Sequence, residues 1–159
     1  MVAMEAVYRR RCDTLLVPQA RKRELATLRL PLTRFETEVI ELESRDAAQE
    51  ALFCVREDGM SMEEVAIEGR YPYRHVDFLL EDIPADGQQR FLSVSAGDVL
   101  DPVAHGDGFE LCRIIGKIEP QPDDPSIRLR VDQRLLNRHF SELASKYTER
   151  RLVTTTSAQ

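Results

Sequence analysis

The side chains of this chain that most readily do nucleophilic, acid–base or metal chemistry are three cysteines and three histidines. Cys12, Cys54 and Cys112 are widely spaced and form no C-x-x-C pair. This spacing disfavours both a disulfide framework and a zinc site, which need cysteines at suitable separations. The cysteines are therefore predicted to be buried or idle thiols in a reducing compartment.

The histidines and glycines form no catalytic or nucleotide-binding motif. His75 and His139 lie far apart in the sequence and lack the spacing of metal ligands. No local Ser-His-Asp or Cys-His signature is present. Gly106 and Gly108 enclose a single residue, which is typical of a hairpin turn rather than a phosphate-binding loop. The sequence therefore predicts neither a bound metal nor a cofactor.

Charge is partitioned along the 159 residues, whose net charge is −6. Residues 1–34 carry +5, residues 35–127 carry −15 and residues 128–159 carry +4. Either the basic ends pack near the acidic middle, since opposite charges attract, or all three segments are solvated surfaces. Phosphate contacts supply most of the affinity for nucleic acid, so this acidic middle predicts no nucleic-acid partner.

The sequence gives no sign of a membrane span or an export signal. No segment approaches the ~20 consecutive apolar residues that a spanning helix needs. The first residues, MVAMEAVYRRR, have no apolar core ahead of their arginines and differ from a secretory signal. These features favour a cytoplasmic location.

The acidic middle predicts a mixture of strands and short helices. A strand is expected over 37–43, after which Ser44 caps a helix that ends at the left-handed residue Gly59. Ser61 and Glu64 form a capping box at the start of a second, short helix. An alternation of strands and helices of this kind indicates a small mixed domain.

The second half of the middle region predicts a third short helix and a β-hairpin. A loop and an edge-like strand are expected over 71–80, and a helix over 84–94 that is interrupted at Gly87. The Gly-Asp-Gly turn over 106–108 then leads into a β-rich run over 109–118.

Helices are also predicted at both ends of the chain. They cover 3–16 and 18–28, and a proline-rich linker over 119–125 precedes a long helix over 127–152. The long helix carries a stripe with a 3.6-residue period, formed by Val131, Leu135, Leu136, Phe140, Leu143, Ala144 and Tyr147. This stripe needs a covering surface, which the N-terminal helices of the same chain or of a second copy in a homodimer would supply.

The hairpin and the elements before it resemble the parvulin-type peptidyl-prolyl isomerases. The segment GDVLDPVAHGDGFELCRIIGKIE, over 97–119, is similar to the closing hairpin of that family. The similarity extends over 35–119, where the family's first helices are matched by Ala47, Ala48, Ala51, Leu52, Gly59, Ser61, Met62, Val65 and Ala66. Divergent, helix-flanked members of the PpiC and SurA type are the most similar.

The resemblance implies an α+β fold in which a parvulin-like module with a small, antiparallel-rich sheet is flanked by N- and C-terminal helices that form a helical lobe. It implies an N-terminal helical arm over 1–34 and an isomerase module over 35–119. A linker and a C-terminal helix over 120–159 would pack on the N-terminal helices.

The resemblance also implies where a catalytic site would lie. Parvulins carry one histidine on the first strand and one in the closing hairpin, and these positions fall at Glu38 and Glu110. Since neighbouring carboxylates repel, the pair is either a dyad that shares a proton or two exposed strand residues. His105, which matches a pocket hydroxyl of the family, is either a polar substitute or a solvent-facing turn residue.

The family's apolar proline pocket falls near Phe78, Ile83 and Phe91, and Phe109 is the fourth expected substrate-binding residue. The glycine-rich segment that usually contributes to this pocket is replaced by residues 69–73, GRYPY. The loss of this segment and of both histidines predicts weak or absent isomerisation.

Two functions remain open on this basis. The first is a peptidyl-prolyl isomerase-family protein that binds extended, proline-containing polypeptide with weak or degenerate catalysis. The alternative is a non-catalytic, SurA-like chaperone or escort for an unfolded or exported peptide. Both predict an unfolded or proline-containing polypeptide as the partner.

Overall fold

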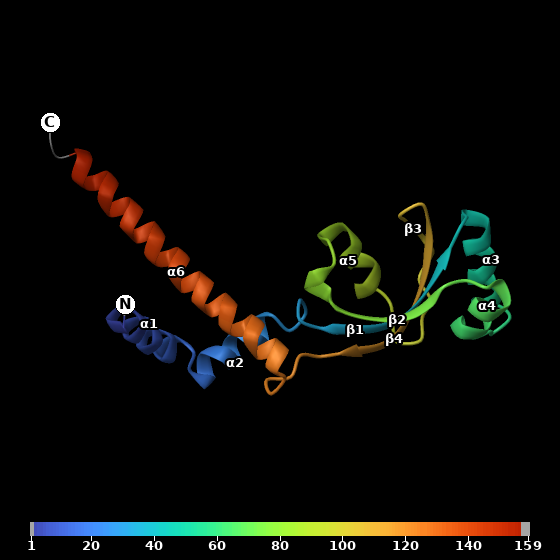
Figure 1. The fold of residues 1–159 in the computed structure, drawn as a ribbon, viewed down its shortest axis with the longest axis horizontal. Coiled ribbons are helices and arrows are strands. Elements are labelled where there is room, and N and C mark those ends of the chain that lie inside the picture. The colour runs from blue at the N-terminus through green and yellow to red at the C-terminus, as the bar shows by residue number, and fades with distance from the viewer. Residues whose placement is uncertain (1, 157–159) are drawn as a thin grey trace. The chain divides into compact units, whose positions relative to one another are not determined.

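The structure is a computed structural model that describes residues 2–156, with the side chains of residues 3–149. Its helices and strands follow one another in the order α1, α2, β1, α3, α4, β2, α5, β3, β4 and α6 (Figure 1). The chain divides into two compact units. We call Leu30–Glu119 the sheet module, and Met1–Arg29 together with Pro120–Gln159 the helical unit.

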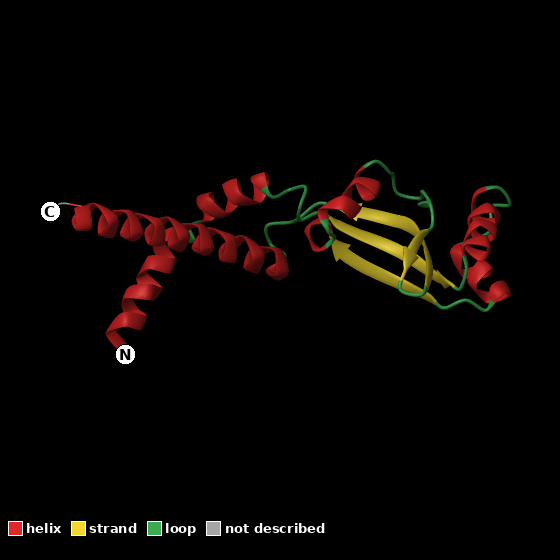
Figure 2. Ribbon diagram, turned by 90° about the horizontal axis from the view of Figure 1, so that it is seen from above, coloured by secondary structure: helices red, strands yellow, loops and turns green. Residues whose placement is uncertain are grey.

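The sheet module contains four strands, three α-helices and one short 3-10 helix. In chain order these are β1 (Arg34–Leu42), α3 (Arg45–Arg56), α4 (Met62–Gly69), β2 (Tyr73–Leu79), η1 (Leu80–Asp82), α5 (Ala85–Leu92), β3 (Val103–His105) and β4 (Gly108–Ile118). The strands form one antiparallel sheet in the order β2-β1-β4-β3, so β2 and β3 are its edges (Figure 2). The predicted α+β fold with a small antiparallel sheet is confirmed.

Local hydrogen bonds explain where α3 and α4 begin. The Ser44 hydroxyl accepts a hydrogen bond from the backbone N–H of Ala47 at 3.2 Å. At α4 the predicted capping box is present: the N–H of Glu64 donates to Ser61 Oγ at 3.1 Å, and the N–H of Ser61 donates to Glu64 Oε2 at 2.8 Å. These bonds satisfy donors that have no partner within the helix. The bonds that the Glu64 carboxylate accepts from the backbone N–H and the hydroxyl of Ser61 also lower the pKa of this carboxyl.

Helix α5 is continuous through Gly87, so the predicted interruption at this residue is wrong. The N–H groups of Gly87 and Gln88 both donate to the carbonyl of Pro84, at 2.8 and 3.2 Å, which carries the first turn through the glycine. A Cβ at position 87 would lie 3.1 Å from Ile83 Cγ2. The glycine therefore makes room for the Ile83 side chain against the helix, at the modest cost of a glycine inside a helix.

The two faces of the sheet bury two separate apolar clusters. On one face, which we call the α3/α4 face, Ile40, Leu42 and Leu111 pack against α3 and α4. On the other, the α5 face, strand residues pack with the segment from η1 to Leu100; the buried members are Phe35, Val39, Leu80, Phe91, Leu100, Cys112 and Ile114. Neighbouring residues of a strand point to opposite faces, so the two clusters alternate along β1 and β4. Figure 1 shows α5 over one end of the strands and α3 with α4 at the other end.

The helical unit consists of three helices. They are α1 (Val2–Leu15), α2 (Pro18–Thr27) and α6 (Pro125–Thr156). Helix α6 contacts both N-terminal helices, and the ring of Tyr8 on α1 stacks on Phe140 of α6 with 5.8 Å between centroids. Helix α6 begins two residues before the predicted start because Asp124 Oδ1 accepts the N–H of Ser126 at 2.8 Å. Among the described residues, no helix is both long enough and apolar enough to cross a membrane.

Ion pairs between side chains join α2 to α6. Arg21 donates hydrogen bonds from Nε and Nη2 to the two carboxylate oxygens of Asp132, at 2.6 and 2.8 Å. Arg138 of α6 pairs with Glu24 of α2, whose side chain is buried. A buried carboxylate without a partner would be costly, so the second pair fixes which turns of the two helices meet.

Candidate functional site

Glu110 lies on the α5 face of β4. Across the sheet it is in register with Glu41 of β1 on one side and with Val103 of β3 on the other. Arg74 of β2 contacts both carboxylates: its Nη2 donates to Glu110 Oε2 at 3.0 Å, and its Nη1 lies 3.1 Å from Glu41 Oε1. A single guanidinium thus offsets the repulsion between two directly paired acidic residues.

Glu38 lies on the opposite, α3/α4 face, because three residues separate it from Glu41 on the same strand. It is in register with His75 of β2 and with Arg113 of β4. The hydroxyl of Tyr73 donates to Glu38 Oε1 at 2.7 Å, and Arg113 Nη1 lies 3.9 Å from Glu38 Oε2. His75 Nε2 lies 3.0 Å from the same Tyr73 hydroxyl. Glu38 therefore belongs to a polar cluster that Glu110 does not join.

The shared-proton dyad that the sequence left open is not formed. Glu38 and Glu110 lie on opposite faces, and each has an arginine partner. They are not freely exposed strand residues either, since their side chains are only 18% and 21% exposed. The physical reason is the register, which pairs Glu110 with Glu41, and Glu38 is three positions from Glu41 along β1; an odd offset places two residues on opposite faces of a strand.

Tyr73 is the most strongly perturbed group of the α3/α4 face. Burial raises its pKa to about 12, and the hydrogen bond to Glu38 and the charges of Glu38 and Glu63 act in the same direction. The positive charge of Arg113 acts the other way and is the weakest of these causes. Tyr73 is therefore a neutral hydrogen-bond donor over the physiological range of pH.

His105 lies at the end of β3, where the chain turns into β4. It is exposed, is in register with Gly108, and has no hydrogen-bond partner among the described residues. A Cβ at position 108 would approach the carbonyl oxygen of Leu42 to 2.4 Å, which explains why glycine is needed in this hairpin. His105 is therefore a solvent-facing turn residue, which is one of the two interpretations that the sequence allowed.

The structure brings together three of the four residues expected to bind substrate. The rings of Phe78 and Phe91 meet edge to face with 5.0 Å between centroids, and both lie 5.7 Å from the ring of Phe35. Ile83 packs against the same cluster. Phe109 does not join them, because it lies on the α3/α4 face with the other cluster.

The three grouped residues differ in accessibility. Phe91 is 8% exposed and belongs to the core, so its ring fills space that an open pocket would need. Phe78 and Ile83 are half-buried and lie where the edge strand β2 gives way to η1 and α5. The accessible apolar surface is therefore beside β2 rather than in the middle of the sheet.

The residues that surround the two carboxylates were not predicted from the sequence. Arg74, Tyr73 and His75 all come from β2, and Arg113 comes from β4. For the three residues of β2, the sequence pattern showed only that polar and apolar residues partly alternate along the predicted edge strand. Which of them reaches which carboxylate depends on the pairing of distant strands.

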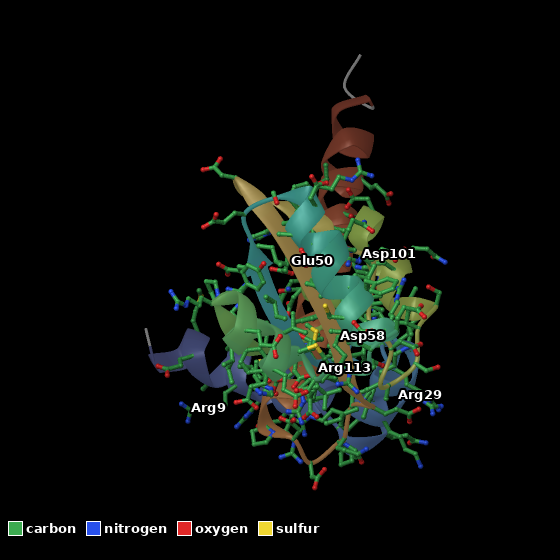
Figure 3. All side chains as sticks on the ribbon, turned by 90° about the vertical axis from the view of Figure 1, so that its right-hand side faces the viewer. Arg9, Arg29, Glu50, Asp58, Asp101 and Arg113 are labelled. Atoms are coloured by element: carbon green, nitrogen blue, oxygen red, sulfur yellow. The ribbon has the colours of Figure 1, made fainter. Side chains whose placement is uncertain are left out.

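A cleft of about 650 Å³ lies elsewhere in the sheet module, between the ends of α3 and α4 and the segment 94–99. Arg113 lines it and is labelled in Figure 3, beside the end of α3. Its Nε donates to the carbonyl of Gly97 at 3.3 Å, while Arg56 donates to Val99 and pairs with Asp101. Both arginines of the cleft are thus already engaged by the protein. In the described part of the chain, no group of three or more histidine, cysteine or acidic side chains could hold a metal ion.

No family model matches this chain. No curated protein matches it either. Among solved structures, the foldase protein PrsA from Streptococcus pneumoniae str. Canada MDR_19A is similar with a TM-score of 0.44 and 15% identity, covering 81% of this chain and 51% of that chain. The peptidylprolyl isomerase PrsA from Bacillus cereus has a TM-score of 0.41 and 15% identity, covering 82% and 57%. This chain spans little more than half the length of either of those chains.

Proposed function

We propose that the sheet module is a parvulin-like module that binds extended polypeptide and isomerises prolyl bonds slowly or not at all. The observation that carries this proposal is the separation of Glu38 and Glu110 on opposite faces of the sheet, each engaged by an arginine. A prolyl isomerase must bind the twisted amide better than either planar form, which requires polar groups gathered around one amide. Two residues on opposite faces cannot contact the same amide.

Binding of polypeptide is supported by the edge strand β2. No other strand of the described chain pairs with its outer side. Extended peptides bind such edges by adding a strand, with main-chain hydrogen bonds supplying affinity and alternate side chains supplying selectivity. Val76, Phe78 and Ile83 offer half-buried apolar surface beside this edge, on the α5 face. An extended segment with apolar or proline side chains fits this surface.

The charge of the sheet module favours basic segments. Residues 30–119 contain 20 acidic and 8 basic side chains, a net charge of −12. Opposite charge raises the rate of encounter and suppresses acidic competitors more than it adds to affinity. The proposed clients are therefore extended segments that combine basic residues with proline or other apolar residues.

A non-catalytic, SurA-like chaperone is the second candidate. It is favoured by the packing of Phe91, because this ring occupies core space on the face where the proline pocket was expected. Isomerisation of a short prolyl peptide, followed by NMR exchange, separates the candidates. Residual acceleration that Glu110→Ala lowers would support a degenerate enzyme, and no acceleration would support the chaperone. Fast isomerisation that neither Glu38→Ala nor Glu110→Ala lowers would contradict the assignment of both positions.

A further inference from the structure

The helical unit contains an apolar groove of about 610 Å³ between α2 and the first turns of α6. The half-buried Leu25 and the exposed Ala26 contribute apolar surface to it, and Ile127 and Val131, which are 4% and 2% exposed, form its buried floor. Pro120 and Pro122 form part of its wall. Proline fixes its own backbone angle, so this part of the wall is comparatively rigid.

The charged residues that line the groove are all basic. They are Arg21, Lys22, Arg29 and Arg128, and none of the lining residues is acidic. Arg21 is engaged by Asp132 outside the groove. Lys22 and Arg128 are exposed and have no side-chain partner among the described residues.

We propose that this groove binds an amphipathic polypeptide segment that carries acidic residues beside its apolar ones. Apolar side chains of the segment lie against Leu25, Ala26 and Pro122, and its carboxylates lie near Lys22 and Arg128. Burial of apolar area supplies most of the affinity, while the charges at the rim select the partner. This site is separate from the one proposed on the sheet module, and the two select opposite charges.

Charge also argues against a second helical unit as the occupant. The residues of the helical unit include 14 basic and 8 acidic side chains, a net charge of +6. Two such units repel each other, whereas an acidic segment is attracted. The occupant is therefore a segment of another protein rather than the equivalent helices of a second copy.

The test uses the full chain and a fluorescent synthetic peptide of about 14 residues, or four helical turns, with leucines at i, i+3, i+4 and i+7 and glutamates on the remaining positions. Two matched peptides replace either the glutamates by lysines or the leucines by serines. Fluorescence anisotropy at low salt should show the glutamate–leucine peptide binding at least about tenfold more tightly than either control, because each control removes one of the two contributions.

Variants locate the site. Lys22→Glu with Arg128→Glu should weaken binding of the acidic peptide about tenfold, since two attractive contacts become repulsive. Arg10→Glu with Lys146→Glu alters net charge equally on exposed positions outside the groove and should change the affinity less than about twofold. Ala26→Trp, at an exposed position that lines the groove, should block binding through bulk alone.

Three results would overturn the proposal. If the lysine peptide bound as tightly as the glutamate peptide, the groove would not select acidic segments. If the groove and control variants lost affinity equally and Ala26→Trp bound the peptide normally, the peptide would bind elsewhere on the protein. Self-association in sedimentation that the peptide fails to displace would show that the groove is a contact between copies.

Discussion

Arg74 on β2 reaches past β1 to Glu110 on β4, with 3.0 Å between Nη2 and Oε2. The same guanidinium lies 3.1 Å from Glu41, so one cation links three neighbouring strands. Glu110 stands at a position where the parvulin resemblance implies a histidine. Its carboxylate is instead engaged by an arginine, which is the arrangement of a structural residue.

The first prediction concerns this three-strand contact. Arg74→Ala leaves Glu41 directly opposite Glu110 without a cation between them. We expect the free energy of unfolding to fall by about 0.5–1.5 kcal/mol, and by less in 1 M salt, because the arginine is partly exposed. Urea unfolding measures this change. Arg45→Ala, an exposed arginine at the start of α3, serves as a control that should alter stability by no more than about 0.5 kcal/mol. Equal effects of the two changes would argue against the bridging role.

The second prediction concerns Tyr73, whose pKa rises from 10.0 to about 12 on folding. Above pH 10 the unfolded chain loses this proton while the folded chain keeps it. The free energy of unfolding should therefore fall as pH rises from 10.0 towards about 12, and this group should have no effect at lower pH. Denaturant unfolding across this range should give a smaller slope for Tyr73→Phe. An unchanged slope would show that Tyr73 titrates normally.

The third prediction concerns Cys112, which is 4% exposed. Burial raises the pKa of its thiol to about 11, and a hydrogen bond with Thr37 acts in the opposite direction. Since the thiolate is the reactive form, Cys112 should be alkylated at least about tenfold more slowly than the half-buried Cys12 and Cys54 at pH 8. Mass spectrometry of the iodoacetamide-treated native chain measures the three rates. Labelling of Cys112 at the rate of the other two would contradict its burial.

The fourth prediction concerns the charge of the sheet module. Basic, proline-containing peptides should bind more tightly than acidic ones of the same apolar content at low salt. The preference should shrink at ~0.15 M salt, where the Debye length is about 8 Å. Apolar contacts beside Phe78 and Ile83 should persist, because burial of area is not screened. Equal affinities for both peptides at low salt would mean that the acidic surface is merely solvated.

The sequence predicted the elements of the sheet module well because their signals are local. Ser44 and the pair Ser61 and Glu64 cap helices through hydrogen bonds that span three residues. The sequence did not predict in the same way on which face of the sheet each strand residue lies. Whether Glu38 and Glu110 meet depends on the register between β1 and β4, which includes a shift between Glu36 and Thr37. That register is set by packing between segments far apart in the chain, and a slip of one residue reverses every side chain.

The glycine that was expected to break α5 illustrates the same limit. Gly87 lowers helix propensity by about 1 kcal/mol relative to alanine, which is the local signal. The backbone of α5 nevertheless continues through Gly87, because the N–H groups of Gly87 and Gln88 both donate to the carbonyl of Pro84. Local propensity therefore predicted an interruption that the structure does not contain.

The central claim is that the sheet module binds extended polypeptide beside β2 and accelerates prolyl isomerisation weakly or not at all. One NMR titration tests both parts, using the full ¹⁵N-labelled chain and an unstructured basic peptide that contains a proline. We predict chemical-shift changes concentrated on β2 and around Ile83, with the cis–trans exchange rate of the peptide raised only slightly or not at all. Rapid exchange of the bound prolyl bond, or shift changes confined to residues away from β2 and α5, would contradict the account.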